Sequence, residues 1–161
     1  MCITDDIINR MITCNKIIIQ NPKRHMEEHG VNLRNDMELS SSDGQEHFSV
    51  FIRQNTQLPD NFSLGLIWKN AELNKNIILY RCNGPHGGNI KIKEHFKPHI
   101  HKITAKNIEN EIYKPTIEGI EITAKYNTFD EALSFFCLNC GIQDACNFFP
   151  QIRSQSLFSD I

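Results

Sequence analysis

The hydrophobic positions at the start of the chain recur at helical spacing. Apolar residues at positions 7, 8, 11 and 12 fall on one helix face. Thr4 precedes Asp5 and Asp6, which is typical of a helix start because the hydroxyl accepts a free backbone N–H and the acids favour the positive end of the helix dipole. Asn21-Pro22 sets the far limit, since a residue before proline is displaced from helical angles. The pattern predicts a helix over about residues 4–18 and a polar linker over 20–36.

From Met37 onward, hydrophobic residues recur at every second position, which is the spacing of a β-strand. Alternation at positions 37–40 and 48–52, separated by the turn residues Ser42-Asp43-Gly44, predicts a hairpin. Further alternating or apolar runs predict strands at about residues 64–68, 77–81, 99–105 and 117–124. Because these runs are short and separated by turn residues, we expect an antiparallel sheet of five or six strands.

The C-terminal third contains the clearest helix pattern. Thr128 and Glu131 have the spacing of a capping box, the apolar positions of 129–140 form one stripe, and Gly141 stands where the helix would end. This predicts a helix over 128–140, a short helix over 142–149 and a flexible tail over 151–161. Cys137 and Cys140 share the apolar stripe and lie at the helix C-terminus, without a second ligand pair nearby, so we expect both to be reduced and buried.

These elements predict one α+β domain over residues 1–150, with the sheet packed against the N-terminal and C-terminal helices. A chain of 161 residues is too short for two large cores. No run approaches the roughly 18 apolar residues of a membrane helix, and Asp5 and Asp6 stand where a signal peptide carries basic residues. We therefore expect a cytoplasmic protein that does not bind membranes, with its six cysteines reduced.

Charge is distributed unevenly along the chain. Residues 81–106 hold six Lys/Arg and one Asp/Glu, whereas residues 107–161 hold three and eight, although the whole chain has a net charge of −2. A basic segment inside a nearly neutral protein is a candidate phosphate or anion site. The alternative is a solvated basic face that is matched by an acidic neighbour.

Four of the seven histidines, His86, His95, His99 and His101, lie inside this basic segment, within a span of sixteen residues. On a strand, His99 and His101 would project to one face, where two imidazoles can act as an acid–base pair. A metal site of the His-x-His type would need a glutamate three or four residues later, where this chain has Ala105 and Lys106. The nearby lysines also disfavour a divalent cation. We therefore expect no metal and no cofactor.

A sequence resemblance extends over about residues 76–146. The segment Tyr80-Arg81-Cys82-Asn83-Gly84-Pro85-His86, followed after a spacer by Pro98-His99-Ile100-His101, resembles a pattern in a group of small uncharacterised bacterial proteins. More loosely, it is similar to the TumE family of toxins from bacterial toxin–antitoxin pairs. Arg81, His86, His99 and His101 match the motif, and the resemblance implies a toxin with an antitoxin or other protein partner.

Two functional hypotheses follow. The first is a toxin-like, metal-independent ribonuclease in a toxin–antitoxin or phage-defence system: one histidine removes the 2′-OH proton of RNA and another protonates the leaving oxygen. The second is a non-enzymatic phage or mobile-element module that docks a protein or a nucleic-acid backbone on its basic loop. A third, bland interpretation is a set of exposed histidines on a loop without function. The predicted catalytic residues are His86, His99, His101 and Arg81, and the predicted substrate-binding residues are Lys91, Lys93, Lys97, Lys102, Asn83 and Gly84.

Overall fold

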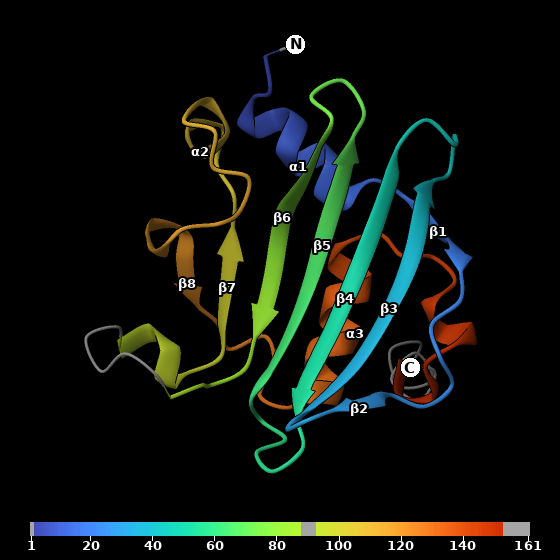
Figure 1. The fold of residues 1–161 in the computed structure, drawn as a ribbon, viewed down its shortest axis with the longest axis vertical. Helices are drawn as coiled ribbons and strands as arrows, with labels where there is room; N and C mark the ends of the chain where they lie inside the picture. The colour runs from blue at the N-terminus through green and yellow to red at the C-terminus, as the bar shows by residue number, and fades with distance from the viewer. Residues whose placement is uncertain (1, 88–92, 153–161) are drawn as a thin grey trace, which may run out of the picture.

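The protein is an α+β domain built on one antiparallel sheet. The computed structural model describes residues 2–87 and 93–152. Within these residues the sheet has eight strands, more than the five or six expected, and α1 and α3 lie together behind it in Figure 1. The strands are β1 (Lys16–Gln20), β2 (Glu27–His29), β3 (Asn32–Ser41), β4 (His47–Asn55), β5 (Phe62–Asn70), β6 (Lys75–Asn83), β7 (His99–Lys102) and β8 (Ile120–Ile122).

The sheet order follows the chain from β3 onward. The order is β1-β3-β4-β5-β6-β7-β8, and β2 pairs with β3 on the same side as β1. The expected hairpin is β3–β4, whose turn contains Gly44 at a φ of 76°, an angle that glycine adopts without a steric penalty. Sequential antiparallel pairing therefore brings β6 and β7 together although a long loop separates them.

The first helix begins as predicted but ends earlier. α1 (Asp5–Thr13) is capped by the Thr4 hydroxyl, which accepts the Ile7 N–H at 3.2 Å. The predicted extension to residue 18 is wrong, because 16–20 form β1 and pair with β3. Three successive isoleucines at 17–19 suit a strand, where β-branched side chains lose less rotamer freedom than in a helix.

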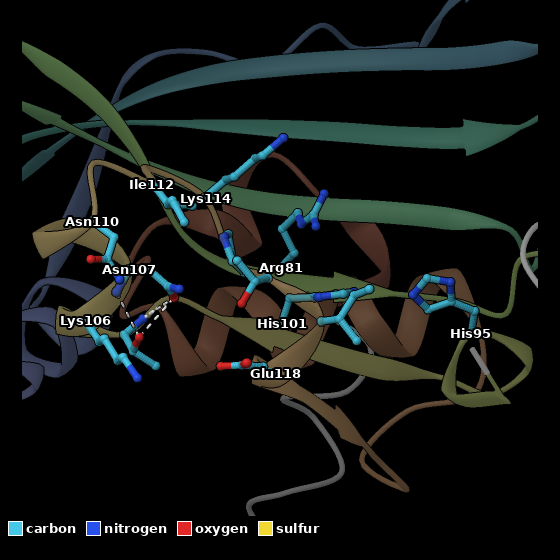
Figure 2. Close-up of a pocket in the computed structure, with 13 residues that line it drawn as sticks. Arg81, His95, His101, Lys106, Asn107, Asn110, Ile112, Lys114 and Glu118 are labelled. Atoms are coloured by element: carbon cyan, nitrogen blue, oxygen red, sulfur yellow. Dashed lines mark hydrogen bonds between the residues drawn. The ribbon is translucent and has the colours of Figure 1, made fainter. Parts of the chain in front are cut away.

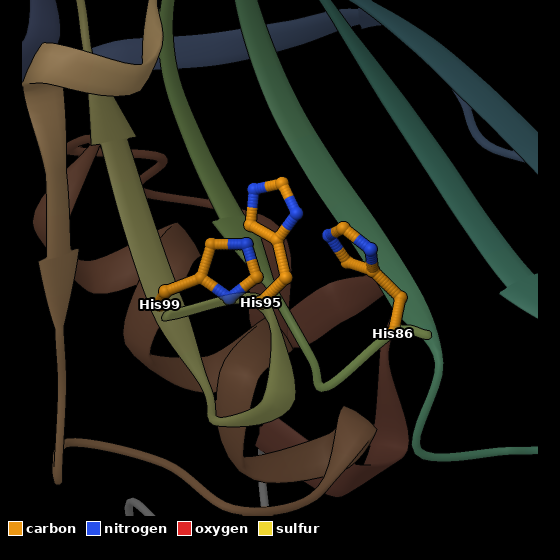
Figure 3. A group of neighbouring side chains, drawn as sticks. All are labelled: His86, His95 and His99. Carbon is orange, nitrogen blue, oxygen red and sulfur yellow. The ribbon is translucent and has the colours of Figure 1, made fainter. Parts of the chain in front are cut away.

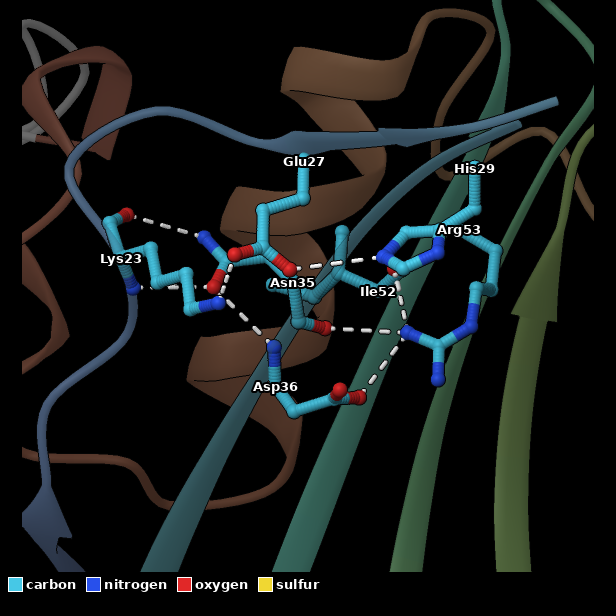
Figure 4. Close-up of polar contacts among 7 residues, drawn as sticks. All are labelled: Lys23, Glu27, His29, Asn35, Asp36, Ile52 and Arg53. Carbon is cyan, nitrogen blue, oxygen red and sulfur yellow. Dashed lines mark hydrogen bonds and ion pairs between the residues drawn. The ribbon is translucent and has the colours of Figure 1, made fainter. Parts of the chain in front are cut away.

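The predicted polar linker over 20–36 is largely a pair of strands. β2 and the first half of β3 occupy 27–36, so only the segment between β1 and β2 connects elements. Asn35 fixes that segment: its side-chain oxygen accepts the Lys23 N–H at 2.9 Å and its amide donates to the Lys23 carbonyl at 3.0 Å. Arg53 donates to the Asn35 carbonyl and to Asp36 on the same strand (Figure 4). Backbone pairing and this polar network order a segment that lacks hydrophobic periodicity.

The C-terminal helix is confirmed. α3 (Phe129–Asn139) is capped by Thr128, which accepts the Glu131 N–H at 3.2 Å, and Gly141 follows with a φ of 67°. Cys137 and Cys140 are free and buried, as expected. The predicted helix over 142–149 is reduced to the 3₁₀ turn η3 (Ala145–Asn147), and the predicted tail lies mostly outside the described residues.

The two late strands are shorter than predicted. β7 ends at Lys102 and is followed by α2 (Ala105–Glu109), while the 3₁₀ turn η2 (Ile117–Gly119) precedes β8. α2 has its own cap, since Thr104 accepts the Asn107 N–H, and the Ala105 N–H donates to Asp5 of α1 at 2.8 Å. These contacts place α2 near the end of β7 and the start of β6 (Figure 1).

Alternation along the strands divides the sheet into two faces. Leu64, Leu66 and Trp68 on β5 are fully buried and, with Cys82 and Ile100, form the core against α1 and α3. Residues between them in sequence project to the opposite face. Arg81, Asn83, His99 and His101 are on that second face, which places the predicted site on the side of the sheet away from the two long helices.

Candidate functional site

Strand register places the predicted site residues in two adjacent rows. Arg81 on β6 is directly opposite His101 on β7, and Asn83 is opposite His99. The Arg81–His101 row lines a cleft of about 660 Å³, within the size range of small-molecule sites, whereas Asn83 and His99 are not among the lining residues. Figure 2 shows Arg81 and His101 at its centre, with Lys106 and Lys114 toward one end and His95 toward the other.

Two further histidines reach the site from the long loop between β6 and β7. The His86 N–H donates to the His95 carbonyl at 2.8 Å and closes the loop on itself. The two rings are 4.4 Å apart between centroids, and each lies 5.1 Å from the ring of His99 (Figure 3). His95, part of the sequence cluster but absent from the predicted site, therefore belongs to it.

His99 is held in one orientation. Its side chain is fully buried, and its Nδ1 lies 2.7 Å from the Lys97 carbonyl oxygen, which can only accept, so Nδ1 carries the proton. Nε2 then keeps its lone pair and faces the cluster. Asn83 supports the ring, with its amide 3.4 Å from Nε2 and its oxygen accepting from Ser63 at 2.7 Å.

His101 and Arg81 each have a buried nitrogen without a hydrogen-bond partner in the described part of the chain, Nδ1 and Nε respectively. His101 is only 5% exposed, and its ring lies 5.0 Å from that of His99. An unpaired buried polar group costs about 1–3 kcal/mol, so it is retained in proteins mainly where a ligand or water completes its contacts. Both residues line the cleft, which makes an anionic ligand the natural partner.

The surroundings of His86, His99 and His101 favour the neutral form of each imidazole. Burial lowers the pKa of His86 to about 4 and that of His101 to about 3, and burial also lowers the pKa of His99. Neighbouring imidazoles and Arg81 act in the same direction, because each disfavours a second positive charge. Neutral imidazoles can accept a proton or bind a metal ion through a lone pair.

Several predicted substrate-binding residues do not face the cleft. Lys102 is opposite Tyr80 on the helix-covered side of β7 and does not line the cleft. The Gly84 N–H, expected to face a phosphate, donates to the Phe62 carbonyl at 3.0 Å instead. Lys93 and Lys97 are exposed beside the histidines but do not line the cleft, and Lys91 lies outside the described residues.

The structure adds cleft residues from the segment after β7. They are polar or basic and come from α2 and the chain leading to β8; the principal ones are Lys106, Asn107, Asn110, Lys114 and Glu118. Thr104 is a recognisable helix cap and could have predicted α2. No local pattern relates Lys114 to the histidines, because only the fold brings it beside Arg81.

Comparison with family models, with curated protein sequences and with solved structures gives no match for this chain. Among the described residues, no helix is both long enough and apolar enough to cross a membrane.

Proposed function

We propose that the cleft is the active site of an RNA-cleaving enzyme, acting in the cell as the toxin of a toxin–antitoxin or phage-defence system. The observation that carries the proposal is the pair formed by Arg81 and His101: both residues line a cleft that also contains His95, and each has a buried nitrogen with no hydrogen-bond partner among the described residues. A guanidinium beside a neutral imidazole combines a phosphate-binding group with a base. The sequence resemblance to TumE toxins favours the cellular role.

The charge of the cleft supports a phosphate-containing substrate. Among its described lining residues, Arg81, Lys106 and Lys114 are cationic, whereas Glu118 is the carboxylate. A volume of about 660 Å³ suits a nucleotide and its flanking phosphates. Asn107 and Asn110 add amide groups that can contact base edges or sugars of a single strand.

The proposed reaction is an internal transfer of the phosphate. The 2′-oxygen of one nucleotide forms a bond to the phosphorus while His101 accepts the 2′-OH proton. The bond from phosphorus to the 5′-oxygen breaks, and that oxygen takes a proton from a donor at the His95 end of the cleft. Arg81 offsets the negative charge that develops on the phosphate. The products are a 2′,3′-cyclic phosphate and a free 5′-hydroxyl.

The test compares two residues that line the cleft, His101 and Arg81, with Lys102, which follows His101 on β7. Wild type, His101→Ala, Arg81→Ala and Lys102→Ala are incubated with end-labelled single-stranded RNA, and the products are examined for cyclic phosphate ends. Lys102→Ala is the matched control, because its side chain leaves β7 on the opposite face. We expect the control to cleave at the wild-type rate and the other two variants to lose about 10²-fold or more.

Expression in cells separates the enzyme from the docking module. The enzyme proposal predicts growth inhibition by wild type and Lys102→Ala but not by His101→Ala. Intact RNA at every protein concentration, with and without added divalent metal, would refute the proposal that the protein is a ribonuclease. Retained binding of RNA or of an acidic protein in that case would favour the non-enzymatic module.

A further inference from the structure

Three imidazoles converge from three different segments of the chain. His86 comes from the loop after β6, His95 from the 3₁₀ turn η1 (Lys93–Phe96) and His99 from the start of β7 (Figure 3). One ring nitrogen of each lies within 4.8 Å of the others. We call these three residues the imidazole trio. Three ligands at about 2.0–2.1 Å from one metal ion lie about 3.4 Å apart, so small side-chain rotations suffice to close the trio around an ion.

A backbone contact holds the His99 ring in the way that metal-binding histidines are usually held. His99 donates its Nδ1 proton to the Lys97 carbonyl, which leaves Nε2 unprotonated; a metal ion bound there would replace the 3.4 Å contact from the Asn83 amide. A second ring nitrogen that donates to a carbonyl is the common support for a metal-binding histidine, because it fixes tautomer and ring orientation. The bond from the His86 N–H to the His95 carbonyl fixes the other two segments relative to each other.

Among the described residues the group of converging ring nitrogens contains no carboxylate, although Glu94 of η1 acts electrostatically on His99. Close packing of the rings at 4.4–5.1 Å is unfavourable for imidazolium ions, because positive charges at this distance repel one another. Neutral nitrogen ligands without carboxylates suit a transition metal such as Zn²⁺ and not Mg²⁺ or Ca²⁺, which require oxygen ligands.

We propose that His86, His95 and His99 bind one divalent transition-metal ion of the Zn²⁺ type, with an open coordination position toward the cleft. His95 also lines the cleft, and the ring of His101 lies 6.1 Å from it, so a fourth ligand would be a water molecule or the substrate. The absent glutamate after His99 is no obstacle, because His86 and His95 supply the remaining protein ligands from outside the His-x-His motif.

The metal's role in cleavage rests on the proposed function, whereas its binding does not. A bound water on such an ion is acidified and is a suitable donor for the leaving 5′-oxygen at the His95 end of the cleft. The ion adds positive charge close to Arg81, and a phosphate anion between them would offset the charge of both. We therefore expect metal and phosphate to strengthen each other's binding.

Metal binding is measured on protein purified without a histidine tag and stripped with a chelator. Zn²⁺ is titrated against a chromogenic competitor, and Co²⁺ is added separately to record the absorption bands of a four-coordinate site. Wild type is compared with His86→Ala, His95→Ala and His99→Ala, and with His47→Ala as a control for an exposed histidine outside the cluster. Circular dichroism verifies folding, and the shift of Tm on adding Zn²⁺ provides a second measure of binding in every protein.

We expect one equivalent of metal in wild type and His47→Ala, and at least tenfold weaker binding in each trio variant. A folded wild type that binds no Zn²⁺ or Co²⁺, or trio variants that bind as tightly as His47→Ala, would overturn the metal site. RNA cleavage at the full rate in chelator would refute the metal's catalytic role but would still support the ribonuclease proposal. Stoichiometric metal with no RNA cleavage would retain the site and refute the ribonuclease.

Discussion

The hydroxyl of Tyr126 lies 2.8 Å from the carbonyl oxygen of His99 and 2.9 Å from that of Asn83. Tyr126 is buried, so its single proton is the donor available to two main-chain acceptors on neighbouring strands. These strands carry the two site rows at their ends. Tyr126 thus fixes the spacing of β6 and β7 at the point where the imidazole trio begins.

Tyr126→Phe should destabilise the protein by about 1–3 kcal/mol, because it removes that donor and leaves buried carbonyls underbonded. Tyr113→Phe is the control, since Tyr113 is only partly buried. Urea unfolding of both variants measures the difference. Equal stability of the two would show that the Tyr126 hydroxyl does not join the strands.

Lys16 is a second buried donor, and it joins the ends of two helices. Its ammonium donates to the carbonyls of Ile12 at 2.8 Å, Cys14 at 2.9 Å and Cys140 at 2.8 Å. Lys16→Met should cost about 2–4 kcal/mol, because three carbonyls lose a charged donor. Lys69→Met removes only an exposed ion pair with Glu38 and should cost less than about 1 kcal/mol. Similar unfolding midpoints in urea would contradict this role of Lys16.

Buried thiols should make the protein less stable at alkaline pH. Burial raises the pKa of Cys140 to about 12 and also raises the pKa of Cys82 and of Cys137 well above the ordinary thiol value. The folded state therefore keeps protons that the unfolded state releases above about pH 9, and the free energy of unfolding falls there by about 1.4 kcal/mol per pH unit for each thiol. Lys16, whose pKa burial lowers, acts in the opposite direction near its folded pKa.

Unfolding by urea at pH 8, 9 and 10, under reducing conditions, measures this slope. Cys137→Ala isolates one thiol: it lowers stability at every pH, but its decline above pH 9 should be shallower than that of wild type. Parallel curves for the two proteins would mean that the Cys137 thiol ionises equally well in both states.

Two glycines of the same turn should respond differently to substitution. A Cβ on Gly84 would collide with the Asp60 carbonyl and the Phe62 ring, whereas nothing lies within 4 Å of a Cβ on Gly87. Gly84→Ala should therefore cost about 1–3 kcal/mol and weaken metal binding by the adjacent trio, while Gly87→Ala should change stability by less than about 0.5 kcal/mol. Thermal unfolding and Zn²⁺ titration measure both effects, and an unaffected Gly84→Ala would show that the turn adapts.

Local chemistry in the sequence determined the helix starts and the hairpin. Thr4 and Thr128 cap α1 and α3 through side chains three residues from the N–H groups they bind, and the turn of the hairpin is closed locally by the Gly44 N–H, which donates to the Ser41 carbonyl. The same-face placement of His99 and His101 also follows from the strand period alone. Alternation likewise puts Lys102 on the other face of β7.

Tertiary structure decided what depended on partners far along the chain. Residues 17–19 are a strand because β3 pairs with them, although their apolar pattern also fits a helix. The polar segment 27–36 is ordered by strand pairing and by the Asn35 contacts, neither of which requires hydrophobic periodicity. His95 entered the site through one backbone hydrogen bond across the loop, and Lys114 through the path of the chain after α2. Caps and strand faces are set within a few residues, whereas a site assembled from loops depends on long-range contacts that a single sequence does not display.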